Sequence, residues 1–455
     1  MSDPVVTIRG SGITVNVSAA SVKVDAGAAM PQTSIQALSV SRNGVYTAPA
    51  RTAYTPVTVN VQPIPRRDVN FYDYDGEIAA SFTAAEFAAL SAMPDLPAHA
   101  GLTAQGWNWS LADAKNYVAS YGKLEIGPSY VTASGKTEID IELLAGDLTP
   151  YLFVGVNGTA TVDWGDGSAV TTLTGTSLFV NKTAGHTYAA AGKYTISIAA
   201  SSGSYSFYNG DFPAPGVLRA AADSTSRSRR YSDRITEIRL GAGITGIKQH
   251  AFYCCGNLKA IAIPNTVTDF AYNAFYNMPT LRHITFPSGV SGVPNGFANV
   301  CRSLESVSFP KSVTSIAKQA FYECDNLKVI TLPPDITSVS NGLLYGCQCL
   351  ETVVVPDGVT SFGTINSTEG GAFYQCGGLL SVNIPSGVTV IGDSTFNQCF
   401  SIKEYHVRPT TPPSLGGYAF SNIQPETKIY VPSASVNTYK AATGWSTYAS
   451  QIYGE

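Results

Sequence analysis

Apolar residues in the second half of the chain follow a repeating pattern. From about residue 235 onward, apolar and other residues alternate over a short segment that ends at a proline, as in Leu327, Ile330 and Leu332 before Pro333. Alternation with a period of two predicts a short β-strand with one buried face. The proline ends the strand because it cannot donate a hydrogen bond to a neighbouring strand.

These units keep an almost constant length. The prolines at Pro264, Pro287, Pro310, Pro333 and Pro356 recur with a period of ~23 residues, as expected of a repeat architecture. Pro385 follows after a longer interval, which indicates a six-residue insertion within Thr364–Gly371. After each proline the pattern continues with V-T-x-I and then A-F-x-x-C. One unit cannot bury its own apolar face, whereas stacked units form a continuous core. The sequence therefore predicts a solenoid of seven units over residues 234–408.

The repeated unit, L-x-x-I-x-I-P-x-x-V-T-x-I-x-x-x-A-F-x-x-C, resembles the BspA-like leucine-rich-repeat family. The unit at 287–309 departs from it because Phe297 comes one residue early, with Cys301 compensating. Residues 409–455, with Gly444-Trp445, are similar to the closing segment of such arrays. We expect them to cap the end of the solenoid, which would otherwise expose a strand edge and core.

Upstream, Val162-Asp-Trp-Gly-Asp-Gly-Ser168 is followed by Gly185-His-Thr-Tyr188 and by Gly192-x-Tyr-Thr-Ile-x-Ile198. These motifs resemble a PKD-type (polycystic-kidney-disease) β-sandwich, which we place at 132–201; the resemblance implies a spacer or an adhesive module. Residues 202–233 are predicted to be a linker.

Residues 66–131 are predicted to form a small α/β module. Thr83-x-x-Glu86 is a capping box, and Ser110-x-x-Asp113 caps a second helix that stops near Gly122. Residues 1–65 are predicted to be an N-terminal β module with turns. Within it, 43–49 and 53–61 resemble short repeats of tail and surface proteins of gut-bacterial phages. The fold class is thus multidomain and β-rich.

Composition narrows the function classes. Only 13% of the residues are charged and the net charge is −4, so no global basic field favours nucleic acid. No apolar run approaches the ~20 residues that span a bilayer. The start, Met1–Arg9, has neither the basic nor the apolar region of a secretory signal peptide. We therefore expect either a removed signal or release without one, as for phage virion proteins at lysis.

Six cysteines occupy one column of the repeat, and Met278 takes the seventh place: Cys255, Cys301, Cys324, Cys347, Cys376 and Cys399. A column spread along a solenoid does not converge on a metal ion. Parallel Cβ directions on stacked units also oppose disulfides. We interpret the column as buried free thiols. Cys254 and Cys349 lie outside it, and a Cys347/Cys349 pair or metal contact is the alternative.

Other chemistry-bearing residues have structural explanations beside functional ones. Asp163 and Asp166 could bind Ca²⁺, but a side-chain-capped turn is favoured because two carboxylates are too few. Trp107 and Trp109 could stack on sugar rings, although core packing is favoured.

Two further charged groups have similar alternatives. Asp73, Asp75 and Glu77 would share one strand face, or lie on a solvated turn. The Arg227–Arg230 cluster could contact an anionic glycan, or lie on a solvated loop.

No catalytic motif is present: G-x-S-x-G, H-E-x-x-H, P-loop and G-x-G-x-x-G are all missing. The five histidines, His99, His186, His250, His283 and His406, have no second ligand type at useful spacing. We predict no catalytic residue, no metal site, no cofactor and no enzyme activity.

The strand positions that point outward are the predicted binding face, because solenoids bind macromolecules on such surfaces. A mixed-charge solvated face is the alternative. The predicted ligand-binding residues are Lys259, Arg282, His283, Glu305, Lys328 and Glu351. A second outward column includes Thr285, Ser308, Thr331 and Asn383.

We hypothesise a phage tail-associated receptor-binding protein, located in the virion or outside cells, whose array contacts a host surface protein or glycan. The N-terminal region would bind other tail proteins, and a homo-oligomer is possible; neither nucleic acid binding nor membrane insertion is expected. The alternatives are a secreted BspA-like bacterial adhesin and, less favoured, a glycan-acting enzyme, which would need two carboxylates across a pocket.

Overall fold

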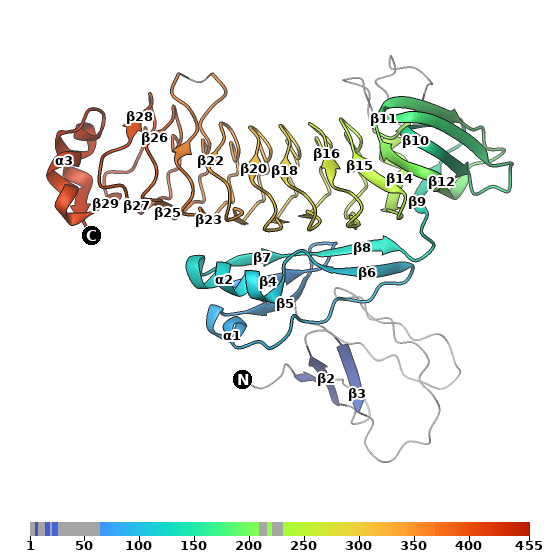
Figure 1. Cartoon of the computed structure of the whole chain (residues 1–455), viewed down its shortest axis with the longest axis horizontal. Helices are drawn as coiled ribbons and strands as arrows, with labels where there is room; N and C mark the ends of the chain where they lie inside the picture. The colour runs from blue at the N-terminus through green and yellow to red at the C-terminus, as the bar shows by residue number, and fades with distance from the viewer. Residues whose placement is uncertain are drawn as a thin grey trace.

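The computed structural model describes residues 64–208, 216–220, 231–366 and 368–455. It also describes the backbone of three antiparallel strands, β1 (Val5–Thr7), β2 (Thr14–Ser18) and β3 (Ser21–Asp25). The phage-like repeats at 43–49 and 53–61 and the basic cluster at 227–230 lie outside the described residues. Figure 1 shows a long array with an α/β module along one side and a β-sheet at its N-terminal end.

The array is built from two sets of parallel strands. Ladder A, as named here, contains the strands before the prolines together with β14 at the start and β30 at the end: β14 (Ile235–Arg239), β17 (His283–Thr285), β19 (Ser306–Ser308), β21 (Val329–Thr331), β23 (Thr352–Val354), β25 (Ser381–Ile384), β27 (Glu404–Val407), β29 (Lys428–Val431) and β30 (Ile452–Gly454). The V-T-x-I segments, named ladder B, are β15 (Ile244–Ile247), β16 (Asp269–Phe270), β18 (Gly292–Val293), β20 (Ser315–Ile316), β22 (Ser338–Val339), β24 (Ser361–Phe362), β26 (Val390–Ile391) and β28 (Ser414–Leu415). Pairing such as His283 with Ser306 advances the chain by one repeat per rung, which confirms the predicted solenoid.

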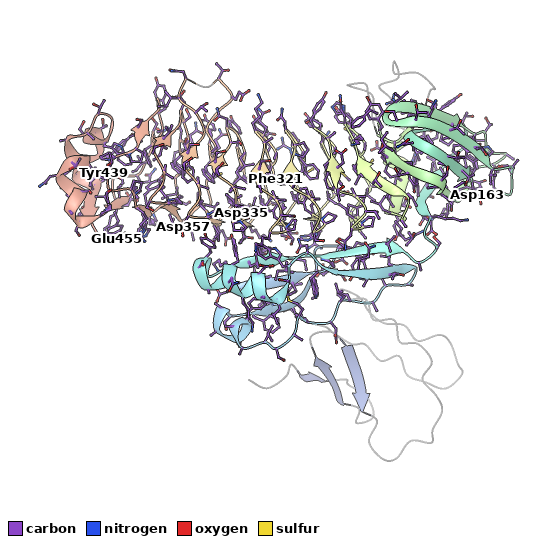
Figure 2. The ribbon with its side chains drawn as sticks, viewed as in Figure 1. Asp163, Phe321, Asp335, Asp357, Tyr439 and Glu455 are labelled. Atoms are coloured by element: carbon purple, nitrogen blue, oxygen red, sulfur yellow. The ribbon has the colours of Figure 1, made fainter. Side chains whose placement is uncertain are left out.

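The A-F-x-x-C segments close each rung on a third side. Their backbones also bond from rung to rung, as from Phe275 N to Phe297 O (2.9 Å) and from Phe321 N to Leu343 O (3.0 Å). Two residues per unit adopt the left-handed conformation, for example Gln319 (φ 57°) and Glu323 (φ 52°). These turns direct the side chain between them, such as Phe321, into the core (Figure 2).

The unit at 287–309 keeps the register of its neighbours, and Phe297 comes one residue early in it, as the sequence indicated. Gly296 (φ 60°) and Val300 (φ 63°) occupy the two left-handed positions, one repeat before Gln319 and Glu323. Phe297 therefore stands where other units have Ala, and Ala298 where they have Phe. Both are fully buried, because the exchange leaves the volume of the rung unchanged.

The cysteine column is buried and its thiols form no disulfide, as predicted. Thiols donate to carbonyls of the preceding rung, as from Cys301 Sγ to Phe275 O (2.9 Å) and Cys399 Sγ to Phe373 O (3.0 Å). Burial raises the pKa of Cys301 and of Cys399 to about 12. Cys254 and Cys349 also form no disulfide. The column therefore acts as apolar filling with low reactivity.

A β-sheet covers the N-terminal end of the array. It contains β9 (Thr137–Leu143), β10 (Tyr151–Asp163), β11 (Thr171–Gly185), β12 (Gly192–Phe207) and β13 (Leu218–Arg219). β9 pairs with β14 and β12 pairs with β15, so sheet and array are continuous. The described strands thus form one sheet that runs past residue 201, where we expected a separate two-sheet sandwich. The likeness to PKD domains stays a prediction.

The C-terminal segment covers the other end. α3 (Val436–Ala441) and the 3₁₀ segment Trp445–Gln451 pack beyond the last rungs (Figure 1). Trp445 Nε1 donates to Pro413 O (2.7 Å), and Tyr439 OH donates to Pro409 O (2.7 Å). Both rings are fully buried, so their polar atoms are satisfied while their apolar surface shields the core.

The α/β module contains β4 (Val69–Tyr72), β5 (Ile78–Phe82), α1 (Ala84–Ala88), β6 (Leu102–Trp107), α2 (Leu111–Tyr121), β7 (Leu124–Ile126) and β8 (Pro128–Thr132). Thr83 and Glu86 form the expected capping box, and Ser110 caps α2, which ends at Gly122 (φ 77°). In the part of the chain that the structure describes, no helix has the length and apolar character needed to cross a bilayer.

Val300 provides a test of the rung geometry. Its φ of 63° strains a β-branched side chain, so Val300→Asn should raise the free energy of unfolding by about 1 kcal/mol. Calorimetry of the full chain would show a higher melting temperature. Gly346 occupies the same left-handed position two rungs later (φ 74°), so Gly346→Val should lower the melting temperature. A lower melting temperature for Val300→Asn would contradict the idea that Val300 is strained.

Candidate binding site

The α/β module lies directly on ladder A (Figure 1). Trp109 Nε1 donates to Phe309 O and Tyr117 OH to Leu332 O, both at 2.6 Å. Asn108 Nδ2 donates to Phe286 O and to Ser308 O, both at 3.2 Å. Buried donors of the module thus satisfy carbonyls on three consecutive rungs, which fixes the module in register with the array.

His283 lies at the centre of this interface. Its ring stacks on Tyr72 at 4.6 Å, and its nitrogens lie 2.7 Å from Ser306 Oγ and 2.9 Å from Thr285 Oγ1. Burial, with a smaller effect of the Arg66 charge, lowers its pKa to about 3. The module and the array approach so closely here that a Cβ on Gly127 would lie 2.0 Å from Thr285 Oγ1.

The predicted open face is therefore only partly open. His283 is 1% exposed, and Thr285, Ser308 and Thr331 are also buried. The expectation that these residues project into solvent is wrong, because the α/β module covers them. The sequence pattern of the array alone carries no signal of that cover.

The charged column consists of Lys259, Arg282, Glu305, Lys328 and Glu351, and some of these residues form ion pairs while others are exposed. Arg282 Nη1 lies 2.9 Å from Glu77 Oε1 of the module, and Arg282 Nε lies 3.0 Å from Glu305 Oε1. Lys328 Nζ lies 2.9 Å from the second oxygen of Glu305. Lys259, Lys328 and Glu351 remain exposed. A binding role for this column stays a prediction.

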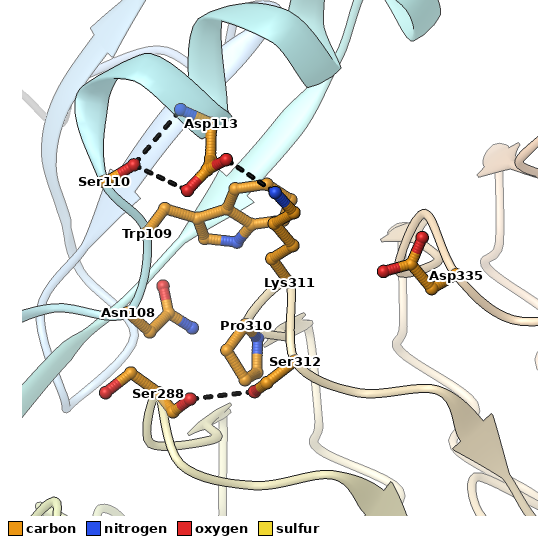
Figure 3. Close-up of a pocket in the computed structure, with 9 residues that line it drawn as sticks. All are labelled: Asn108, Trp109, Ser110, Asp113, Ser288, Pro310, Lys311, Ser312 and Asp335. Atoms are coloured by element: carbon orange, nitrogen blue, oxygen red, sulfur yellow. Dashed lines mark hydrogen bonds and ion pairs between the residues drawn. The ribbon is translucent and has the colours of Figure 1, made fainter.

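A cleft opens where the start of α2 meets the turns that follow the prolines (Figure 3). Its volume is about 360 Å³. The lining residues are Asn108, Trp109, Ser110, Asp113, Ser288, Pro310, Lys311, Ser312 and Asp335. The sequence analysis missed this site because its two sides lie far apart in the chain. The sequence signals on the module side were Trp109, for which core packing was favoured over sugar stacking, and the helix cap of Ser110 with Asp113.

The cleft carries one ion pair. Lys311 Nζ lies 2.7 Å from Asp113 Oδ1, and Ser110 Oγ donates to Asp113 Oδ2 (2.8 Å). Lys311 and Ser110 lower the pKa of Asp113, and Asp113, with a smaller effect of Asp335, raises the pKa of Lys311. A glycosidase acid requires a raised pKa. The shift at Asp113 is in the opposite direction, so this arrangement favours binding over acid catalysis.

The other candidate residues have structural partners. Asp163 Oδ1 and Asp166 Oδ1 accept from Gly165 N (2.9 Å) and Ser168 N (3.0 Å), which is the capped turn that we favoured. Hydrogen bonds from Ser168 and His186 lower the pKa of Asp166 to about 2.

Asp73, Asp75 and Glu77 do not converge, because they contact His99, a turn N–H and Arg282 respectively. Trp107 and Trp109 pack in the module core, as favoured. Among the described residues, no group of three or more His, Cys, Asp or Glu is placed to hold a metal ion.

Tyr117→Phe tests the docking of the module. The change leaves Leu332 O without its buried donor, which should cost about 1–3 kcal/mol. We expect faster amide hydrogen exchange across α2 and ladder A. The matched control is Tyr121→Phe on the same helix, whose hydroxyl accepts from Asp357 N at an exposed position. A larger effect of Tyr121→Phe would contradict the role of Tyr117.

The buried His283 makes stability depend on pH. The fold keeps it neutral down to a pKa of about 3, whereas the unfolded chain protonates near 6.5. Its contribution is therefore complete above pH 6.5 and is lost as pH falls toward 3, by at most about 1.4 kcal/mol per pH unit. His283→Gln should flatten the decline of the melting temperature over this range. Thr285→Val, which removes a partner but no titrating group, should keep the slope of the wild-type chain.

Comparisons with known proteins concern the array. The family model for the BspA type Leucine rich repeat region matches in six copies, over residues 230–297, 245–371, 293–424 and 364–443. No curated protein matches the chain.

Solved structures with similarity include a leucine-rich repeat protein from Bacteroides ovatus (23% identity, TM-score 0.36, 42% of this chain and 48% of that one). A second is a leucine rich cell surface protein from Faecalibacterium prausnitzii (25% identity, TM-score 0.32, 44% of this chain and 61% of that one). A third is a leucine-rich repeat protein from Eubacterium ventriosum (22% identity, TM-score 0.26, 45% of this chain and 68% of that one).

The chain thus spans about half to two thirds of the lengths of these three structures. The assignment rests on the family model and on the regular rungs of the array, and it confirms the resemblance predicted for 234–408. The C-terminal array of this chain is thus similar to the BspA type Leucine rich repeat region.

Proposed function

We propose that this chain is a non-enzymatic recognition protein that binds a macromolecule at a bacterial surface. The observation that carries the proposal is the composite surface made by the array and the α/β module. The charged column, whose residues lie just before the strands of ladder A, borders the module, and the cleft opens where the module meets the array. The BspA-type repeat region supports a recognition or adhesion role at a cell surface.

The more specific role that we propose is receptor binding by a phage tail. The motifs at 43–49 and 53–61 support it, since they resemble short repeats of phage tail and surface proteins. In this proposal the N-terminal region attaches to other tail proteins, and the array contacts a host protein or glycan. The location would then be the virion, and several copies could act together; light scattering after size-exclusion chromatography measures their number.

The charged column allows a direct test with the full chain. The variant Lys259→Ala/Lys328→Ala/Glu351→Ala changes exposed residues of the predicted face, and its binding to intact gut-bacterial cells should fall at least tenfold. The loss would reflect missing charge complementarity with the partner.

A matched control changes exposed charges on the β-sheet instead: Lys136→Ala/Glu142→Ala/Lys193→Ala. It should bind as well as the unchanged chain. If the unchanged chain binds no cells, the proposed function fails. If it binds and both variants bind equally well, the face is assigned to the wrong residues.

A further inference from the structure

We infer that the cleft between α2 and the turns of the array binds one neutral hexopyranose unit of a surface glycan. The inference deepens the proposed function and rests on it. Two separate parts of the fold form the cleft. Trp109, Ser110 and Asp113 come from the module, whereas Ser288, Lys311 and Asp335 come from three successive rungs. Ligand sites often form at such junctions, where two rigid bodies present convergent polar groups.

The charges of the cleft disfavour ions. A metal ion would meet only the carboxylates of Asp113 and Asp335, and the ammonium of Lys311 lies 2.7 Å from one of them. Ca²⁺ requires about 6–8 oxygen ligands. An anion would meet two carboxylates against one ammonium, so the local charge repels it. The lining therefore selects for an uncharged ligand.

The same groups suit a ligand with many hydroxyls. A sugar hydroxyl can donate to a carboxylate oxygen of Asp335 and accept from Lys311, and such charge-assisted hydrogen bonds are about twice as strong as neutral ones. Lys311 is ion-paired but its side chain is 53% exposed, so it can still reach a ligand. The hydroxyl of Ser312 donates toward Ser288 O (2.8 Å) and Val290 O (2.6 Å), which leaves its oxygen able to accept.

The lining also has an apolar part, to which Trp109 of the module and Pro310 of the array belong. Pro310 contributes a ring surface, and the Lys311 side chain extends to Asp113 (Figure 3). Trp109 itself is only 6% exposed. This surface can pack against the C–H groups of one sugar ring but not against a larger apolar ligand. A volume of about 360 Å³ is at the lower end for ligand pockets, which fits one ring with its chain continuing into solvent.

The test is saturation-transfer NMR on the full chain, with the methyl glycosides of glucose, galactose, mannose and N-acetylglucosamine added separately. At about 10 mM, at least one should receive saturation, since single sugars in open sites bind with millimolar Kd. Asp335→Asn should weaken that binding at least tenfold. The matched control is Asp357→Asn, because Asp357 lies on the next rung and outside the cleft (Figure 2); it should bind like the unchanged chain.

Two results would overturn the inference: no glycoside receives saturation, or Asp335→Asn binds as tightly as the unchanged chain. Melting temperatures of both variants establish that each is folded, and both aspartates are exposed turn residues. N-acetyltyrosinamide is added as a probe for an aromatic peptide, and its binding in place of every glycoside would also overturn the inference.

Binding to cells separates this inference from the proposed function. If Asp335→Asn binds cells and no glycoside binds the chain, the inference fails and the recognition role stands. If a glycoside binds in the cleft and no cells bind, the recognition role fails and the sugar site stands.

Discussion

Stacking of rungs at hydrogen-bonding distance is the constraint on which the rest of this molecule depends. Each unit buries Leu, Ile and Phe side chains only against the rung before and the rung after it. Backbone hydrogen bonds on all three sides hold successive rungs in register. Buried cysteines and aromatic rings fill the axis of the array. Because this packing is continuous, a substitution in one rung also alters the packing of the adjacent rungs.

A stacked array has two open ends, and this chain closes them in different ways. At the N-terminal end the sheet of β9 to β12 continues into β14 and β15, so the first rung is a paired strand of a larger sheet. At the C-terminal end Tyr439 and Trp445 are buried beyond the last A-F segments. Both solutions cover core that the end rungs would otherwise expose, and exposed core promotes aggregation in repeat proteins.

The side chains on the outer face of ladder A decide where the α/β module sits. Beneath the module this column contains Thr285, Ser308 and Thr331, whose small side chains allow a close approach, and Gly127 meets Thr285 there. Past the module the same column contains His406 and Tyr430, which stack on each other at 5.4 Å. The module therefore fits one half of the face and leaves the other half uncovered. The cleft forms at the edge of the module, so the candidate site is a consequence of docking.

Sequence alone determined the features that local periodicity controls. The constant spacing of the prolines, the alternation before them and the cysteine column predicted the solenoid, its register and the burial of its thiols, because each rung repeats the same short-range contacts. Caps such as Thr83 with Glu86 were equally visible, since they involve neighbours in the chain.

Only the tertiary structure decided that the α/β module covers His283 and Thr285, that the β-sheet is continuous with the array, and that Trp109 and Lys311 border one cleft. These contacts join segments that lie far apart in the chain. They depend on shape and on buried hydrogen bonds between separate elements, and such complementarity leaves no periodic trace in the sequence of either partner.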